Sequence, residues 1–581
     1  MAELNVSRKT ISKLLSEMQG KKFIIPEYQR PYKWDEDTCA TLWDDLLEFF
    51  VDKKDDEEFY LGTIVTYKSE SIKNEVQVID GQQRLTSLLL LLRAFYKKLD
   101  QMAESQNVIG LKRQLEPCIW DVDPISTLVQ DKTKIHIESK VATDEDNQVL
   151  HEILTNGTTH DTKKDNYTIN YKIFYSKCEE YALKEPMKWE SLCVAILKST
   201  IILPIECENE DTALRIFSTL NDRGMSLSDS DIFKAQIYKI KPTSESKTEF
   251  NEQWKDLTEK TEEVKLEIND LFRYYSHIIR GKASDRTKEI ALRKFYSGSD
   301  NKFKILHDPL LMVDLFNLSE FWSSVIQNRK ETNIYNSDFT YNTFEYANAE
   351  TQKYLQCLSV YPNEYWKYLL SVFFYKNIGA ENFIEKFNSF IKKVISFLFQ
   401  SFVINPTVNE IKSDIYGACI DIIHDRGLNF SIEINESFDE NFKNSQSTKI
   451  ARGMILLKAY LDSDQKELIK EFEIEHIFPR KWQTANYNNW NRKDAEQYLE
   501  RYGNKIAFEK KLNIQAGNGY FDTKKGHYSR SKISEVKKLS LLSQPDWLKQ
   551  DIERREVEFK DILYNFFQEH TTWVIQKSST E

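Results

Sequence analysis

The chain has 581 residues, of which 40% are hydrophobic and 29% are charged, and it contains only 16 glycines and 12 prolines. This composition excludes a disordered or fibrous protein, and the length predicts several domains with separate cores. The net charge of -11 argues against nucleic acid binding over the whole surface, so any such site must be local.

The N-terminal segment is predicted to begin with a helix. Residues 1–22 are expected to form an amphipathic helix that Gly20 ends. An apolar strand then reaches Pro26, followed by a polar and aromatic loop with a buried Arg30 and by an acidic helix. The apolar face of the first helix would consist of Ile11, Leu14, Leu15 and Met18.

The segment Gln77–Leu92 is predicted to be a strand that turns directly into a helix at Asp80 and Gly81. The first N-H groups of a helix lack partners and lie at the positive end of its dipole, so they bind anions. Arg84 adds a permanently charged donor. This corner therefore predicts an anion site, although a single strand-glycine-helix corner is also common as an ordinary connection.

Three motifs between Ile25 and Leu91, IPEYQRPYKW, FYLGTIV and VIDGQQRLTSLLLL, resemble the ParB/sulfiredoxin-like domain of modification-dependent defence nucleases. The GmrSD type of restriction endonuclease is the nearest named family. The resemblance implies that this domain binds, and hydrolyses, a nucleotide triphosphate such as GTP or ATP. The implied nucleotide-binding residues are Gln29, Arg30, Asp80, Gly81, Gln82, Gln83, Arg84 and Thr86.

Residues 93–198 are predicted to be mostly helical, and a strand is expected over Ser199–Glu208. A helix, an Asn-Asp-Arg-Gly loop and a second helix follow, and Ser228 with Asp231 predicts an N-terminal cap. By the same resemblance, Asn221 and Arg223 in the loop would close the nucleotide site. A well-capped helical hairpin without a ligand is the alternative.

From residue 241 to 443 the chain is rich in Phe, Tyr, Leu and Lys at helical spacing, with few turn signals. This pattern predicts an all-helical middle domain. We expect its aromatic residues to form core and not platforms for stacking bases.

A second group of candidate residues lies near the C-terminus. A short strand is predicted to end at Glu475 and His476, and Asn504 and Asn513 follow, nine residues apart. Residues 474–550 contain 15 Lys and Arg against 8 Asp and Glu, a local surplus of positive charge that suits nucleic acid. The alternative is a structural Glu-His strand end with incidental asparagines.

Residues 450–542 resemble an HNH nuclease of the ββα-metal class. Phosphodiester hydrolysis needs a base for water and a cation near the phosphate. His476 would be the base, Asn504 would orient its ring, and Glu475 and Asn513 would bind Mg²⁺ or Mn²⁺. The expected catalytic residues are thus His476, Asn504 and Asn513, and the expected phosphate-binding residues are Lys524, Lys525 and Arg530.

These patterns together predict a multidomain α+β protein that is predominantly helical. We expect a ParB/sulfiredoxin-like α/β domain over residues 1–240, with a helical insertion at about 100–198, a helical domain over 241–443 and an HNH domain over 444–581.

The expected function is an NTP-regulated, metal-dependent endonuclease of anti-phage defence. By resemblance its partner would be double-stranded, modified phage DNA, and a homo-oligomer or a partner defence protein remains open. A nucleotide-dependent DNA-binding regulator without nuclease activity and a growth-arresting RNase are the alternatives.

Cysteine usage and the N-terminus both predict a cytoplasmic protein without a membrane partner. The seven cysteines are scattered without a C-x-x-C pair, as expected for reduced thiols. The N-terminus lacks the apolar region of a signal peptide, and the run Leu88–Leu92 is far shorter than the roughly 18 residues that span a bilayer.

Overall fold

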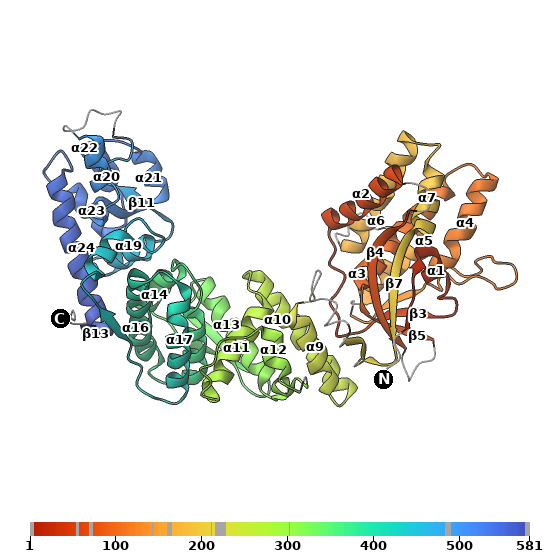
Figure 1. Ribbon diagram of the computed structural model, residues 1–581, viewed down its shortest axis with the longest axis horizontal. Coiled ribbons are helices and arrows are strands. Elements are labelled where there is room, and N and C mark those ends of the chain that lie inside the picture. The colour runs from red at the N-terminus through yellow and green to blue at the C-terminus, as the bar shows by residue number, and fades with distance from the viewer. Residues whose placement is uncertain are drawn as a thin grey trace, which may run out of the picture. The chain divides into compact units, whose positions relative to one another are not determined.

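A computed structural model of the protein describes residues 5–53, 57–68, 74–141, 144–159, 165–210, 212–214, 216, 228–300, 302–482 and 490–575. The chain divides into two compact units, Met1–Glu252 and Gln253–Glu581 (Figure 1). It is a mixed α/β, mostly helical, multidomain protein, as the sequence predicted.

The first unit is built on a mixed seven-stranded sheet in the order β1-β7-β4-β5-β3-β6, with β2 also paired to β7. β4 is parallel to β7 and antiparallel to β5, and β3 is parallel to both β5 and β6. The strands are β1 (Asn5–Val6), β2 (Lys9–Thr10), β3 (Lys22–Ile25), β4 (Phe59–Lys68), β5 (Glu75–Asp80), β6 (Ile137–Ser139) and β7 (Thr200–Cys207).

Helices pack around this sheet (Figure 1), and α3 is buried along most of its length. Leu88–Leu92 are all 0% exposed, because α3 packs against α4, α5 and α6 on several sides. The helices described in this unit are α1 (Ile11–Ser16), α2 (Glu36–Asp52), α3 (Gln82–Asp100), α4 (Gln106–Ile119), α5 (Asp144–Asn156), α6 (Asn166–Lys184), α7 (Trp189–Ser199) and α9 (Asp229–Ile240).

The N-terminus differs from the expected helix over residues 1–22. The helix is confined to α1, because Thr10 caps its N-terminus and the residues before it pair with β7 as β1 and β2. The expected cap at Ser228 is confirmed, since its Oγ accepts a hydrogen bond of 3.3 Å from the Asp231 amide.

The second unit is mostly helical. α10 (Ser244–Glu263) runs across the boundary between the units, and β8 (Glu331–Tyr335) pairs with β9 (Tyr341–Glu345). The remaining helices up to residue 445 are α11 (Ile268–Lys282), α12 (Leu292–Ser297), η2 (Lys304–His307), α13 (Leu311–Ile326), α14 (Ala349–Ser359), α15 (Trp366–Asn377), α16 (Phe383–Ile404), α17 (Val408–Ile423) and α18 (Phe438–Ser445).

The β8-β9 hairpin corrects the expectation of an all-helical middle segment. Its strands carry Thr332, Ile334, Thr343 and Phe344, residues that suit a pleated strand, on either side of a polar turn. The expectation that the aromatic residues form core is confirmed: Phe321 stacks on Phe374 at 4.2 Å between ring centroids, and both are buried.

α16 is the one described helix that is long and apolar enough to cross a membrane. Its most apolar window is 67% buried within the structure, which is typical of a core helix. All seven cysteines are free and buried, as expected from their spacing.

The C-terminal part of the second unit contains two further pairs of strands. β11 (Phe472–His476) is antiparallel to β12 (Lys505–Glu509), and β10 (Ser431–Ile434) is parallel to β13 (Thr572–Ile575). The second pairing crosses the boundary expected at residues 443 and 444. The helices here are α19 (Ala451–Tyr460), α20 (Arg492–Tyr498), η4 (Tyr502–Asn504), α21 (Lys510–Ala516), α22 (Phe521–Tyr528), α23 (Ser534–Ser540) and α24 (Lys549–His570).

Candidate functional sites

The first candidate site is the corner between β5 and α3. Gly81 caps α3 in the left-handed region at φ +86°. A Cβ atom there would lie 2.8 Å from Ile64 Cγ1 and 3.1 Å from the Thr63 carbonyl oxygen, so glycine is required for both conformation and space. The amides of the first turn of α3 follow directly.

The Arg84 guanidinium is held on one side of this corner. Its Nη1 donates a 2.8 Å hydrogen bond to the Thr63 carbonyl, and the side chain is half-buried. Gly62, at φ +130° beside a register shift in β4, makes room for it: a Cβ there would lie 2.8 Å from Arg84 Cζ. Sequence analysis did not assign Gly62 a role, although a glycine inside the strand pattern FYLGTIV is the signal of such a close approach.

Asp80 is half-buried at the end of β5. Burial raises the pKa of its carboxyl, and the Gly81 amide, Arg84 and Arg30 act in the opposite direction. Arg30 itself is exposed, in contrast to the expected buried position, because the loop presents it to solvent. The corner therefore combines one carboxylate with two arginines, one of them exposed to solvent.

The glutamines at this corner mostly bind the protein's own backbone. Gln29 Nε2 donates to the Ile79 carbonyl at 3.2 Å, and the Gln83 side chain bonds Pro31 and Lys33 at 2.9 and 2.7 Å. These two side chains clamp the aromatic loop to the corner. By contrast, buried Gln82 has a carbonyl oxygen without a described hydrogen-bond donor.

Three further residues were expected to bind the nucleotide. Thr86 is 1% exposed inside α3. Asn221 and Arg223 lie outside the described residues.

The second candidate site is the hairpin of β11 and β12. His476 ends β11 and lies opposite Lys505, the first residue of β12, and α21 packs against both strands. The three elements follow in the order strand, strand, helix.

The His476 ring faces a carboxylate that sequence analysis did not single out. Its Nε2 lies 3.3 Å from Glu500 Oε1. Glu500 Oε2 also pairs with the Lys505 ammonium at 2.5 Å. His476 and Lys505 lower the pKa of Glu500 to about 2, which keeps it ionised at neutral pH.

The described hydrogen bonds of the Asn504 side chain go to backbone groups and not to the His476 ring, in contrast to its expected role. The side chain is fully buried, accepts from the Phe478 amide at 2.7 Å and donates to the carbonyls of Phe478 and Leu499. Its backbone carbonyl accepts from the Ile477 amide at 2.9 Å. Asn504 thus ties the turn after His476 to the turn before β12.

Glu475 and Lys524 form a buried ion pair. The Lys524 ammonium lies 2.7 Å from Glu475 Oε1, Tyr528 donates to the same oxygen at 2.8 Å, and Lys524 also donates to the His476 carbonyl at 2.7 Å. Burial lowers the pKa of Lys524 and Glu475 opposes that shift. Lys524 is 1% exposed, so it cannot grip DNA phosphates as expected.

The other expected phosphate-binding residues differ in exposure. Lys525 donates to the carbonyls of Leu542 and Gln544, at 3.3 and 3.0 Å, and so holds a loop. Arg530 is exposed on the surface, beside His527 and Gln515.

The expected metal ligands fit a divalent cation only in part. Asn513 is half-buried on α21 and offers an amide oxygen, but Glu475 already has a cation partner in Lys524. Among the described residues there is no group of three or more His, Cys, Asp or Glu that could hold a metal. Any bound Mg²⁺ or Mn²⁺ would have to keep most of its waters, as these ions commonly do.

Comparison with known proteins finds family models that match the two segments in which the candidate sites lie. The sequence model described as the N-terminal domain of the GmrSD restriction endonuclease matches residues 11–238, and the model of the C-terminal domain of these enzymes matches residues 431–562. An uncharacterized protein of Methanocaldococcus jannaschii is 24% identical over 264 residues, which cover 41% of this chain and 43% of that protein. The chain thus matches less than half the length of this relative.

Proposed function

Because the chain belongs to the GmrSD family of restriction endonucleases, we propose that it is an NTP-regulated nuclease of anti-phage defence that cuts foreign, modified DNA. The observation that carries the proposal is the pairing of His476 with Glu500 at the end of the β11-β12 hairpin, within the segment matched by the C-terminal family model. We assign this hairpin with α21 to the ββα-metal class of HNH nucleases.

His476 is the general base of the proposed reaction. With Nε2 toward Glu500, the ring presents Nδ1 to a water molecule, and the ionised carboxylate stabilises the imidazolium that forms. As the water proton moves to Nδ1, a bond forms between the water oxygen and phosphorus. The bond from phosphorus to the leaving oxygen breaks, and that oxygen takes a proton from solvent.

Glu475 and Asn513 are the residues that would hold Mg²⁺ or Mn²⁺. When bound, the cation supplies positive charge for the negative charge that develops on the phosphate. Since Lys524 already neutralises Glu475, we expect weak cation affinity and full activity only at raised metal concentration.

Exposed basic residues around the hairpin are proposed to bind the DNA backbone. Arg480 and Lys481 follow His476 in the chain, and Lys510 and Lys511 begin α21, all on the surface, as is Arg530. Backbone contacts of this kind position the nucleic acid without reading its sequence. These exposed residues take the place of Lys524, which was expected to bind phosphates but is buried.

The β5-α3 corner is proposed to bind GTP or ATP. The first-turn amides of α3 and the fixed Arg84 guanidinium suit the phosphates. The unpaired Gln82 oxygen suits a hydroxyl or amino donor of the nucleotide. Hydrolysis of the bound nucleotide would then regulate cutting.

A cleavage assay tests the nuclease. Purified protein is incubated with plasmid, modified phage DNA and total RNA, with GTP or ATP, in Mg²⁺, Mn²⁺ or EDTA. We expect cutting of modified DNA that requires a metal and disappears in His476→Ala, while DNA affinity and melting temperature stay near wild type. His307→Ala, at an exposed histidine of η2, is the matched control.

The same assay separates the alternatives. Cutting of RNA alone would support a growth-arresting RNase, and nucleotide-dependent DNA binding without any cutting would support a regulator. Full activity of His476→Ala would contradict the HNH assignment.

The seven free, buried cysteines support a reducing compartment such as the cytoplasm.

A further inference from the structure

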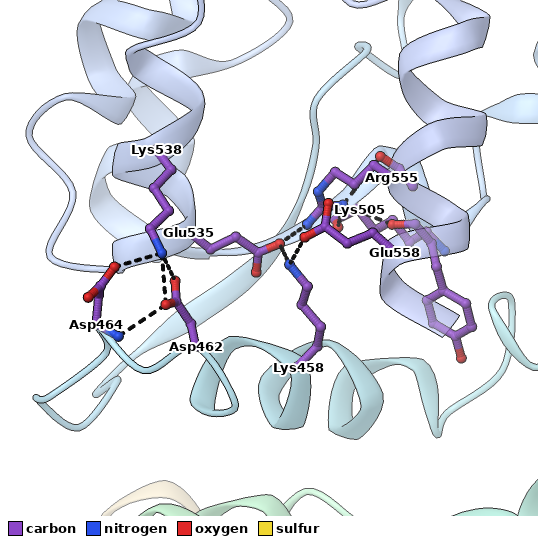
Figure 2. A network of polar contacts seen from close by, with 10 residues as sticks. Lys458, Asp462, Asp464, Lys505, Glu535, Lys538, Arg555 and Glu558 are labelled. Carbon is purple, nitrogen blue, oxygen red and sulfur yellow. Dashed lines mark hydrogen bonds and ion pairs between the residues drawn. The ribbon is translucent and has the colours of Figure 1, made fainter. Parts of the chain in front are cut away.

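Three charged side chains from three helices meet inside the second unit, behind the turn that precedes β12. Lys458 of α19 and Arg555 of α24 both donate to Oε1 of Glu535 on α23 (Figure 2). All three residues are at most 7% exposed. Burial alone would raise the pKa of Glu535, but Arg555 and Lys458 outweigh that effect and lower it.

The Arg555 guanidinium also binds backbone. Its Nη1 donates to three carbonyl oxygens: that of Tyr502 at 3.0 Å, that of Gly503 at 3.3 Å and that of Lys505 at 2.7 Å. These carbonyls lie on either side of Asn504. A planar guanidinium with fixed donors suits such a set of acceptors better than an ammonium does.

The turn itself is pressed against α24. A Cβ atom at Gly503 would lie 1.9 Å from the Ile552 carbonyl oxygen, so no larger residue fits between the turn and the helix. The ring of Tyr502 stacks on Phe559 of the same helix at 4.5 Å. The position of the turn is therefore set by α24 and not by the hairpin alone.

The turn carries residues that contact the candidate catalytic pair. Lys505 lies opposite His476 in the ladder, and its ammonium bonds Glu500. The Asn504 carbonyl holds the Ile477 amide, next to His476. A shift of this turn would change the 3.3 Å separation of His476 and Glu500.

We propose that Arg555 is a positioning residue for the nuclease site: through its bonds to the Tyr502, Gly503 and Lys505 carbonyls it holds the Tyr502–Lys505 turn so that His476 and Glu500 stay paired. This inference rests on the proposed nuclease function. Buried ion pairs contribute little net stability compared with apolar residues of similar size. We therefore expect the contacts among Lys458, Glu535 and Arg555 to fix the position of the turn more than to stabilise the fold.

The test compares two double variants of the full chain with the same change in charge. Arg555→Met with Glu535→Gln removes the donor to the turn, and Lys458→Met with Glu535→Gln leaves that donor in place. We expect the first to lower kcat for DNA cleavage about 100-fold, as small misplacements of catalytic groups do. KM should stay unchanged, and the second variant should stay within a few-fold of wild type.

Hydrogen exchange supplies a readout that is independent of cutting. The Arg555 double variant should lose amide protection at residues 476–478 and 502–505, and the Lys458 double variant should keep it. Equal exchange in the two variants, or a loss of kcat that follows melting temperature in both, would overturn the inference. If wild-type protein cuts nothing, the nuclease proposal fails and the exchange data still decide whether Arg555 positions the turn.

Discussion

Several polar side chains at the two candidate sites bind the protein's own backbone, and this sets what is left for ligands. The Gln29, Gln83 and Asn504 amides satisfy carbonyl and N-H groups at strand ends and loops. An amide offers both a donor and an acceptor, so it suits that task as well as ligand binding. The groups left for a ligand include the Gln82 oxygen and the other donors of Arg84 at one site, and His476 with Glu500 at the other.

The first prediction at the residue scale concerns Glu500. Glu500→Gln keeps the shape of the side chain but removes the charge that faces His476, so we expect cleavage to fall roughly 10- to 100-fold with DNA affinity unchanged. Glu496→Gln, at an exposed pair with Arg492 on α20, is the control and should cut normally. Cleavage rates of wild type and both variants, measured at a saturating DNA concentration, test this prediction.

The pH dependence of that effect follows from the lowered pKa of Glu500. Because the folded-state pKa is about 2, below the ordinary value of 4.5, the charge is fully present above about pH 4.5 and is lost only as pH falls toward 2. The wild-type cleavage rate should therefore show no inflection from Glu500 until the pH falls toward 2. An inflection near pH 4.5 that disappears in Glu500→Gln would contradict the assignment.

The second residue-scale prediction concerns Gly62 and the nucleotide site. In Gly62→Ala, the new Cβ would lie 2.8 Å from Arg84 Cζ, so the guanidinium must move. We expect GTP or ATP affinity to fall at least about tenfold, as in Arg84→Ala, because a charge-assisted phosphate contact is lost. Calorimetry measures this.

Gly110→Ala is the control for Gly62→Ala. Gly110 lies in α4 with open space around its Cα, and alanine favours a helix, so this variant should bind nucleotide normally. Unchanged affinity in Gly62→Ala and in Arg84→Ala would place the nucleotide elsewhere.

At the scale of elements, local patterns were sufficient where neighbours in sequence set the structure. The β5-α3 corner and the end of β11 at His476 were both predicted, because periodicity and turn residues are local signals. The pairing of residues 5–10 with β7 was missed, since strand pairing is non-local. Glu500 was missed for the same reason: only the folded turn brings it to His476.

A prediction at this scale concerns the packing of α11 against α13. Burial raises the pKa of Asp314 on α13 to about 6, and a hydrogen bond with Tyr275 of α11 only partly opposes this. The folded protein thus binds this proton more tightly than the unfolded chain does. Stability from this group is present at low pH and falls as pH rises from about 4 to 6.

Asp314→Asn removes the free-energy cost of ionising this buried carboxyl group. The amide oxygen of the variant can still accept a hydrogen bond from Tyr275. One pKa unit corresponds to about 1.4 kcal/mol, so we expect the variant to be more stable at pH 7.5, by an amount on the order of 2 kcal/mol. At pH 4 the difference should nearly disappear. Denaturant melts at both pH values test this, with the exposed Asp256→Asn of α10 as control; equal effects at both pH values would contradict it.

At the scale of the whole molecule, the distribution of charge indicates where DNA would bind, and the strand pairing indicates where the C-terminal part of the fold begins. The chain carries a net charge of -11, yet residues 474–550 hold 15 Lys and Arg against 8 Asp and Glu. DNA binding should therefore reside in the second unit alone. The sequence placed the start of the nuclease segment at residue 444, whereas β13 pairs with β10 at residues 431–434.

The last prediction follows from this pairing. A fragment of residues 444–581 lacks β10, so β13 loses its ladder, and it also lacks Phe438 and Asp439, which contact Tyr564 of α24. It loses the contact of Thr571 with Gln400 of α16 as well. We expect this fragment to aggregate or to melt without cooperativity.

A fragment of residues 244–581 keeps α10 whole together with all of these contacts, so it should fold and bind DNA. Its affinity should fall steeply with salt, because each neutralised phosphate releases counterions and contributes roughly -0.9 to the slope of log affinity against log salt. Thermal melts and DNA titrations from low to physiological salt compare the two fragments with the full chain. Cooperative folding of residues 444–581 would show that β10 and α16 are dispensable for folding. A DNA affinity of residues 244–581 that does not change with salt concentration would exclude the basic residues around α21 as the DNA surface.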